Sequence, residues 1–362
     1  MKDSIAERML AELMCWEAEE LKEHAAKLQA LAVLKYDEYE QYKPGIKFAE
    51  HLVIWLRQFE EGREREDALQ FIEKNLLFIT NRELNHIIRL AYPDWVKIEI
   101  RNAVAEQLSL SSWDVSHIVA STDFKIALRR SLFLGLSDGA RLDRFRRASP
   151  ELSHEQFAQE YEVADRSVER MTEELQKALR ALGSNDRLIF NKVWLIDDFA
   201  GSGHTLIRPH VTPEGEFNGK LPKFKRRLER LAKQSLVEAD ASVNVLLYIA
   251  SSQATDHVKS TLEEAKLDWQ LHVIHKIPSK SCVQESTAFA KLCHKYYDPS
   301  TKDEHKSETQ LGYSGCALPL VISHNTPNNS VCLLWAETGT ESPARNRRAL
   351  FPRYERHHKD RQ

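Results

Sequence analysis

The chain has 362 residues, of which 42% are hydrophobic and 29% charged, and its formal net charge at pH 7 is -3. This length exceeds that of a usual single domain, and the composition supports a sizeable core, which excludes a disordered or collagen-like chain. No run of about 18 apolar residues occurs, and the charged N-terminus lacks the apolar stretch of a signal peptide, so we expect a soluble, cytoplasmic protein.

The cysteines and histidines give no sign of a metal or disulfide framework. The five cysteines are odd in number and lack CxxC spacing, and the histidines show no HExxH spacing. We therefore expect reduced thiols and no zinc site.

Residues 1–115 are predicted to form a helical N-terminal region. Apolar residues recur at steps of three and four in the first 31 residues, in "FAEHLVIWLRQF" (48–59) and in "EDALQFIEKNLLFI" (66–79). Asn81 is the candidate N-cap of a further helix, and Glu83 is the acid of its first turn.

Residues 116–362 are predicted to form an α/β domain. Helical patterns at 167–182, 221–239, 257–267 and 287–297 alternate with short apolar runs. These runs are "SLFLGLSDGA" (131–140), "RLIFNKVWLIDDFAG" (187–201), "SVNVLLYIASS" (242–252), "DWQLHVIHKIP" (268–278), "ALPLVISHNTP" (317–327) and "SVCLLWAET" (330–338). The alternation predicts a mostly parallel sheet flanked by helices.

The stretch "VWLIDDFAGSGHT" (193–205) holds the main candidate site. Ligands of an open parallel sheet bind beyond the carboxyl ends of its strands, where Asp197 and Asp198 would lie. The loop that follows exposes backbone N–H groups to a ligand, and a helix beginning near Gly203 would favour an anion there. Its residues are Ala200, Gly201, Ser202, Gly203, His204 and Thr205.

The two carboxylates and the loop favour different parts of one ligand. A carboxylate repels phosphate but accepts hydrogen bonds from vicinal hydroxyls, and it helps to hold a Mg²⁺ ion on the same hydroxyls. The loop suits a phosphate. The residues therefore predict a sugar phosphate, and ribose 5-phosphate fits. No P-loop or dinucleotide-binding glycine pattern is present.

This stretch resembles the phosphoribosyl-pyrophosphate (PRPP) motif of type I phosphoribosyltransferases. The resemblance implies that Asp197 and Asp198 hold the ribose hydroxyls as the catalytic acids, together with Mg²⁺ bound to PRPP. It also implies that residues Ala200 to Thr205 cradle the 5-phosphate. Pro209 departs from the expectation of a long helix after the loop, and "RPHVTPEGEFNGKLP" (208–222) has the character of an insertion.

A wider set of motifs is similar to the phosphoribosyltransferase-like conflict effectors of bacteria. These motifs are "LFLGLSDGA", "DDFAGSGHT", "NGKL", "HNTPNNS", the following Trp335, and "LFPR". The resemblance implies a toxin-like effector of antiviral defence, in some cases part of a retron. It implies helical and winged-helix segments ahead of a phosphoribosyltransferase-like domain. In a retron, the partners would be a reverse transcriptase with its RNA and DNA.

Two further turns are candidate binding sites. Ser137, Asp138, Gly139, Ala140 and Arg141 could bind pyrophosphate through backbone N–H groups and the guanidinium, and the alternative is an ordinary turn before a helix. Asn325, Thr326, Asn328 and Asn329 could bind an acceptor group, and the alternative is a Pro-Asn turn.

The sequence is compatible with three functions. The first is transfer of a phosphoribosyl group from PRPP to an unknown acceptor. The second is a sensor that binds a ribose phosphate or nucleotide without chemistry. The third is a nucleic-acid-associated scaffold that uses the basic segments 141–147, 223–233 and 345–361, for which the alternative is solvated helix faces and a frayed tail.

Overall fold

The computed structural model describes residues 3–160, 165–184, 187–210, 216–299, 309–338 and 347–354. The chain divides into two compact units. Unit 1 combines both ends of the chain, Met1–Leu84 and Pro278–Gln362, and unit 2 is the continuous segment Asn85–Ile277. These limits differ from the single boundary predicted near residue 115. The boundary near residue 115 stays a prediction.

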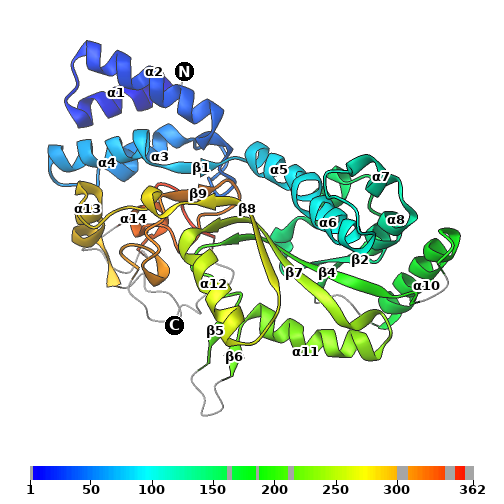
Figure 1. The fold of residues 1–362 in the computed structure, drawn as a ribbon. Coiled ribbons are helices and arrows are strands. Elements are labelled where there is room, and N and C mark those ends of the chain that lie inside the picture. The colour runs from blue at the N-terminus through cyan, green and yellow to red at the C-terminus, as the bar shows by residue number, and fades with distance from the viewer. Residues whose placement is uncertain are drawn as a thin grey trace. The chain divides into compact units, whose positions relative to one another are not determined.

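Unit 2 contains the predicted run of alternating strands and helices (Figure 1). Most of α5 (Asn81–Leu90) belongs to it. The following elements, in chain order, are η2 (Ala91–Val96), α6 (Lys97–Gln107), α7 (Val115–Ala120), α8 (Thr122–Arg129), β2 (Ser131–Gly135), η3 (Asp138–Ala140), α9 (Leu142–Ala148), η4 (His154–Gln156), β3 (Phe157–Gln159), α10 (Asp165–Ala181), β4 (Phe190–Ala200), β5 (Arg208–Pro209), β6 (Phe217–Asn218), α11 (Lys220–Lys233), β7 (Val237–Ser251), α12 (Ser252–Glu264) and β8 (Gln270–Ile277).

The five-stranded sheet of unit 2 has the strand order β3-β2-β4-β7-β8. All of its strand pairs are parallel, as the alternation predicted. Every residue of β2 is buried, and so are residues 193–197 of β4. Continuous apolar runs formed these strands because a parallel sheet with helices on both faces excludes water from both sides.

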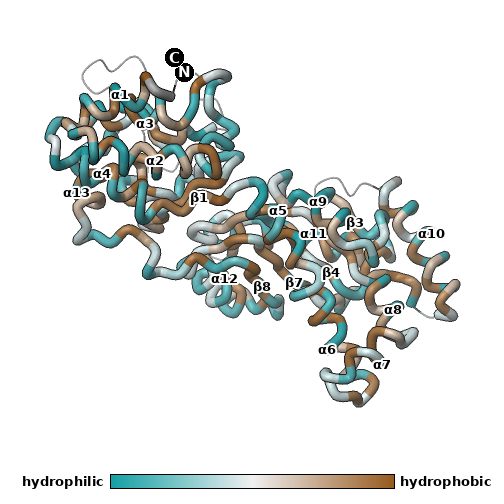
Figure 2. The backbone as a smooth tube through the Cα atoms, turned by 90° about the horizontal axis from the view of Figure 1, so that it is seen from above, coloured by the Kyte–Doolittle hydropathy of each residue, from teal (hydrophilic) through white to brown (hydrophobic). Residues whose placement is uncertain are grey.

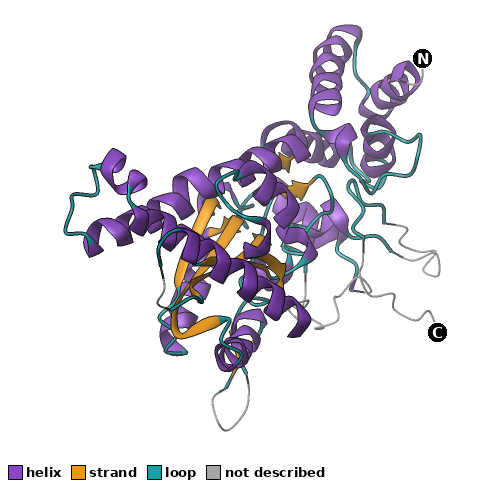
Figure 3. Ribbon diagram, turned by 90° about the vertical axis from the view of Figure 1, so that its right-hand side faces the viewer, coloured by secondary structure: helices purple, strands orange, loops and turns teal. Residues whose placement is uncertain are grey.

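Helices cover both faces of this sheet (Figure 3). On one face, Val193, Leu195, Val245 and Leu247 form a core cluster with apolar residues of α10, α11 and α12. On the other face, aromatic rings pack between strand and helix: the centroids of Phe133 and Phe145 lie 5.6 Å apart. With both faces covered, the ends of the strands are the places left for a ligand, and ligands of open parallel sheets bind at the carboxyl ends.

Unit 1 is mainly helical. Its described α-helices and strands include α1 (Asp3–Met14), α2 (Ala18–Leu34), α3 (Phe48–Leu56), α4 (Gly62–Lys74), β1 (Leu77–Ile79), α13 (Ala288–Tyr296), β9 (Leu320–Ile322) and α14 (Cys332–Trp335). β1 and β9 form a separate two-stranded parallel sheet. Both strands are short and apolar, and the hydrophobic residues of β1 appear brown in Figure 2.

The core of unit 1 joins segments from opposite ends of the sequence. The Trp55 indole Nε1 donates a hydrogen bond of 2.7 Å to the carbonyl of Leu333. The rings of Phe71 and Phe289 stack with centroids 3.7 Å apart. Neither half of this core is complete without the other, because each buries its aromatic side chains against the other half.

Some local predictions were wrong. The helix predicted over 66–79 ends at Lys74, and 77–79 form β1, because this apolar run pairs with β9. The strand predicted over 330–338 is the short helix α14. Residues 3–130, which are fully described, contain β1 as their only strand, so a winged helix with its β-hairpin is absent from that segment.

The predicted N-cap of α5 was displaced by one residue. Thr80 precedes the helix, and its hydroxyl accepts a 3.0 Å hydrogen bond from the backbone N–H of Glu83. The Glu83 carboxylate in turn accepts from the backbone N–H of Thr80 at 2.8 Å. This reciprocal pair is a capping box, so the acid of the first turn was predicted correctly but its partner was not.

Candidate functional site

The carboxyl ends of β2 and β4 bring the predicted 137–141 turn together with the acid pair, Asp197 and Asp198. The strands pair in register up to Gly135 and Ile196, and the backbone N–H of Leu136 then donates to the carbonyl of Ile196 at 2.8 Å. One residue further along each chain, the Ser137 hydroxyl donates a 2.5 Å hydrogen bond to Oδ1 of Asp197. Two residues that are 60 positions apart in sequence therefore meet at the carboxyl ends of neighbouring strands.

Asp197 is a buried carboxylate with partners on both oxygens. Its exposed fraction is 3%, and Nζ of Lys220 lies 2.5 Å from Oδ2 in an ion pair. Burial raises the pKa of Asp197, the neighbouring Lys220 ammonium opposes that rise, and Asp198 adds to it. The ammonium group of Lys220 thus balances the charge of the buried Asp197 carboxylate. An unpaired charge at this position would be strongly unfavourable.

Asp198 lies against the turn that follows β2. A Cβ atom added to Gly139 would sit 2.4 Å from Oδ2 of Asp198, so only glycine allows this approach. The buried Tyr248 of β7 supports the turn, because its hydroxyl donates to the carbonyl of Ala140 at 2.9 Å. Burial raises the pKa of Tyr248 well above its usual value, with the acids Asp198 and Asp197 adding to the rise.

The predicted pyrophosphate turn forms a compact bend. Asp138 to Ala140 make one 3₁₀ turn, with Asp138 exposed, Ser137 and Gly139 half-buried and Ala140 buried. Arg141 follows in the left-handed region at φ 46° and is half-buried at the start of α9. The structure therefore brings the 137–141 turn beside the acid pair; its affinity for pyrophosphate stays a prediction.

The predicted phosphate loop is largely buried and is not followed by a helix. Ala200, Gly201, Ser202 and Gly203 are buried, His204 is half-buried and Thr205 is exposed. Gly203 has φ +80°, and its carbonyl accepts the N–H of Leu206 at 2.9 Å. Residues 201–210 contain no helix, and the chain passes into the antiparallel pair of β5 and β6. The helix expected near Gly203 is therefore absent from residues 201–210.

The loop packs against the start of α12. A Cβ on Gly203 would meet Val258 Cγ2 at 2.9 Å, so this glycine serves both a positive φ and a close approach. The Ser251 hydroxyl donates to the carbonyl of Gly201 at 2.5 Å. The rings of His204 and His257 lie 4.5 Å apart, and burial lowers the pKa of His204, as do His257 and Arg208.

The start of α11 completes the site. The backbone N–H of Lys220 donates to the carbonyl of Thr205 at 3.0 Å, and that of Leu221 to Leu206 at 2.9 Å. These bonds place the Lys220 side chain beside Asp197. Sequence reasoning missed Lys220 and Tyr248 as site residues. The "NGKL" motif (218–221) was the available signal for Lys220, but nothing local connected it to an acid 23 residues earlier.

The predicted acceptor residues lie in unit 1, where they make hydrogen bonds within that unit. Thr326 is buried, and its hydroxyl pairs with Tyr39 at 2.9 Å. Asn329 Nδ2 lies 3.3 Å from Cys316 Sγ, and Asn325 Oδ1 accepts the backbone N–H of Tyr354 at 3.0 Å. Asn328 is half-buried, and its carbonyl accepts from Tyr313 at 2.7 Å. These contacts account for the residues structurally, and the acceptor role stays a prediction.

The acids do not form a metal site made of protein atoms. Among the described residues, no group of three or more His, Cys, Asp or Glu side chains could hold a metal ion. Both oxygens of Asp197 already accept hydrogen bonds, from Ser137 and Lys220. A Mg²⁺ ion would therefore need most of its oxygen ligands from the bound molecule and water.

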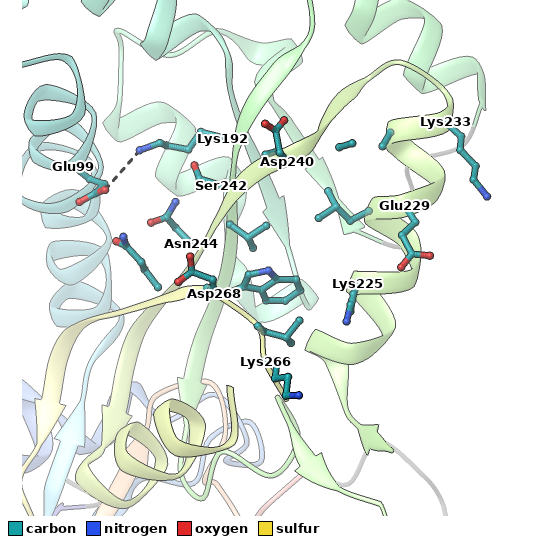
Figure 4. Close-up of a pocket in the computed structure, with 18 residues that line it drawn as sticks. Glu99, Lys192, Lys225, Glu229, Lys233, Asp240, Ser242, Asn244, Lys266 and Asp268 are labelled. Carbon is teal, nitrogen blue, oxygen red and sulfur yellow. Dashed lines mark ion pairs between the residues drawn. The ribbon is translucent and has the colours of Figure 1, made fainter. Parts of the chain in front are cut away.

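A separate cavity of about 850 Å³ lies at the amino ends of β4, β7 and β8 (Figure 4). The acid pair belongs to the carboxyl-terminal part of β4. Its lining carries both signs of charge, and Lys192 pairs with Glu99 at 3.7 Å inside it. Ligands of open parallel sheets bind at the carboxyl ends, and no single charge dominates this cavity. The carboxyl end of β4, with Asp197 and Asp198, is therefore the better candidate site.

Comparison with known proteins identified one family. A family model described as PRTase-CE matches residues 52–353, a range that includes the acid pair, the 137–141 turn and Lys220. No curated protein and no solved structure matches the chain. Within the described part of the chain, no helix is both long and apolar enough to cross a membrane.

Proposed function

The chain belongs to the PRTase-CE family, the phosphoribosyltransferase-like conflict effectors, and on that premise we propose that unit 2 binds PRPP and transfers its phosphoribosyl group to an acceptor in antiviral defence. The observation that carries the proposal is the contact between the 137–141 turn and the acid pair, with Gly139 against Asp198. A ribose at Asp198 would then have a pyrophosphate turn on one side and a phosphate loop on the other.

The proposed reaction breaks the bond between C1 of the ribose and the pyrophosphate oxygen, and the pyrophosphate leaves with the electron pair. A nucleophile of the acceptor forms the new bond to C1 and loses its proton. The protein binds and orients the reactants: Asp197 and Asp198 on the ribose side, Ala200 to Thr205 at the 5-phosphate, and Ser137 to Arg141 at the pyrophosphate. Mg²⁺ bound with PRPP would screen the pyrophosphate charge.

Titration calorimetry with PRPP and Mg²⁺ tests the binding step. We expect the wild-type protein to bind, and the double variant Asp197→Asn/Asp198→Asn to bind at least about tenfold more weakly, since hydrogen bonds to charged groups contribute about 1.5–3 kcal/mol each. The exposed Lys223 provides a control variant, Lys223→Met, which should bind as the wild type does. Absence of wild-type binding, or undiminished binding by the acid variant, would exclude this function.

Pyrophosphate release separates transfer from sensing. A panel of bases, nucleotides, RNA and proteins is added to the PRPP-bound protein, and released pyrophosphate is measured. Release with one acceptor class supports transfer. Tight binding without release by any acceptor supports the sensor, and the absence of a helix after the phosphate loop makes that outcome a specific alternative.

The basic face of α11 favours the scaffold as a second candidate. Five of its cationic side chains are exposed, whereas its apolar residues Leu221, Phe224 and Leu231 are buried; the exposed set is Lys223, Lys225, Arg226, Arg230 and Lys233. Of the basic segment 345–361, only 347–354 lie within the described residues. Nucleic-acid binding that weakens steeply with salt, and is reduced by charge-removing changes on α11, would support a scaffold.

A further inference from the structure

Lys220 is held at the site by the backbone around it. It is the first residue of α11, after Gly219, which has φ +124° and packs so tightly that a Cβ would lie 2.4 Å from the carbonyl oxygen of Leu206. The Lys220 N–H also donates to Thr205 at 3.0 Å. The end of the phosphate loop therefore determines where the ammonium group lies.

The carboxylate of Asp197 connects three separate elements. Its Oδ2 accepts from Lys220 on α11, and its Oδ1 accepts from Ser137 in the turn after β2, each at 2.5 Å. The Lys220 side chain is 28% exposed, whereas that of Asp197 is 5% exposed. Solvent therefore reaches the ion pair mainly from the lysine, and the carboxylate is buried.

This geometry divides the work of the two acids. Asp197 uses both oxygens to hold side chains of other elements, whereas Asp198 is half-buried beside Gly139 and its Oδ1 accepts the backbone N–H of Phe199 at 3.0 Å. We infer that Lys220 is a positioning residue of the ribose-phosphate site: its ammonium keeps Asp197 as a carboxylate, and Asp197 then holds Ser137 so that the 137–141 turn stays against Asp198. The ligand side of this inference rests on the proposed function, and Asp198 is then the acid that meets the ribose.

The groups around Asp197 are consistent with this role. Lys220 is its cationic neighbour, Asp198 is a like charge on the same strand, and Tyr248 of β7 lies within electrostatic reach of both acids. Without Lys220, the burial of Asp197 and the nearby Asp198 would both favour protonation of Asp197. A protonated Asp197 would lose one acceptor position and hold Ser137 less firmly.

The experiment uses the full chain with five variants: Lys220→Met, Lys220→Arg, Asp197→Asn, the double variant Lys220→Met/Asp197→Asn, and the control Lys223→Met. Lys223 lies on the same helix and is exposed. The first measurement is amide hydrogen exchange of residues 137–141 without ligand, where the N–H of Ala140 donates to Ser137 at 3.0 Å. The second is PRPP affinity by calorimetry.

We expect Lys220→Met to speed exchange in the 137–141 turn and to weaken PRPP binding about tenfold or more, as for removal of one partner of a buried ion pair. Lys220→Arg should restore most of both properties, since it keeps the charge. The double variant should bind no more weakly than Asp197→Asn alone, because the lysine acts through that carboxylate. Lys223→Met should match the wild type.

Two results would overturn the inference. One is unchanged exchange at 137–141 in Lys220→Met. The other is additive losses in the double variant, which would mean that Lys220 contacts the ligand directly. If Lys220→Met does not fold, the double variant is compared with Asp197→Asn alone. Faster exchange at 137–141 or weaker PRPP binding in the double variant than in Asp197→Asn would overturn the inference. If the wild type does not bind PRPP, the proposed function fails, and the exchange result alone decides whether Lys220 positions the turn.

Discussion

Gly139 and Asp198 are in such close contact that a single added methyl group would lie 2.4 Å from the Asp198 carboxylate oxygen Oδ2. Gly139 lies in the turn after β2, and Asp198 lies near the carboxyl end of β4. Their contact joins the predicted pyrophosphate turn to the predicted ribose acids. Glycine is required at position 139 because the Asp198 side chain occupies the space that a Cβ atom would need, and not because of a positive φ.

Gly139→Ala should therefore weaken PRPP binding by about tenfold or more, because either the turn or Asp198 must move. We expect a smaller effect on the free energy of unfolding, since the turn is at the surface of the sheet edge. Calorimetry and thermal unfolding measure the two effects. Gly62→Ala is the control: nothing lies within 4 Å of the added Cβ. Equal affinities of Gly139→Ala and wild type would contradict the proposed site.

Gly203→Ala tests the phosphate loop. Gly203 and Gly183 have nearly the same φ, +80° and +81°, but only Gly203 is crowded, by Val258, His257 and Ala254. Forcing alanine into the left-handed region costs about 1–2 kcal/mol at either position. Gly203→Ala should be more destabilising than Gly183→Ala in urea unfolding, and only Gly203→Ala should weaken PRPP binding. Similar behaviour of the two variants would mean that backbone strain alone matters at residue 203.

The stability of the protein should fall as the pH is lowered through the range where histidine titrates. Burial lowers the pKa of His51, His204 and His272 in the folded state. The unfolded chain then binds more protons than the folded chain near pH 6. The free energy of unfolding therefore increases as the pH rises through this range and decreases as the pH is lowered. The slope per histidine is at most about 1.4 kcal/mol per pH unit.

Urea unfolding at pH 7.5 and 5.5 measures this dependence. His272 Nε2 pairs with Asn244 Oδ1 at 3.0 Å, and His272→Gln should show a smaller loss at pH 5.5 than the wild type. The control His275→Gln changes an exposed residue on the same strand and should keep the wild-type dependence. A loss that is unaffected by His272→Gln would place the titrating groups elsewhere.

Fragments of the chain distinguish the two possible boundaries. Residues 85–277 contain the whole five-stranded sheet and its core cluster, so this fragment should unfold cooperatively. Residues 116–362 keep Phe289 and Leu333 but lack their partners Phe71 and Trp55. The C-terminal part of that fragment should bind a hydrophobic dye and lack a cooperative transition. A stable, dye-free 116–362 fragment would support the boundary predicted near residue 115.

Sequence patterns predicted β2 and the buried parts of β4 and β7 because a strand buried on both faces must be apolar along that part. The edge strand β8 is partly exposed, and it was predicted from the alternation of apolar runs with helical patterns. They failed at 77–79 and 330–338, where short apolar runs fit either helix or strand and the choice depends on distant partners. β1 exists because Leu320 to Ile322 pair with it. No local pattern within 66–79 contains that information.

The sequence by itself determined the parts of the candidate site that are contiguous: the acid pair after an apolar strand and the small residues that follow it. Their order along the chain is a local property, and local order survives folding. Only the tertiary structure decided that Ser137 and Lys220 share the carboxylate of Asp197, and that Gly139 touches Asp198. Strand register and the docking of α11 bring these residues together, and both depend on packing across the whole sheet.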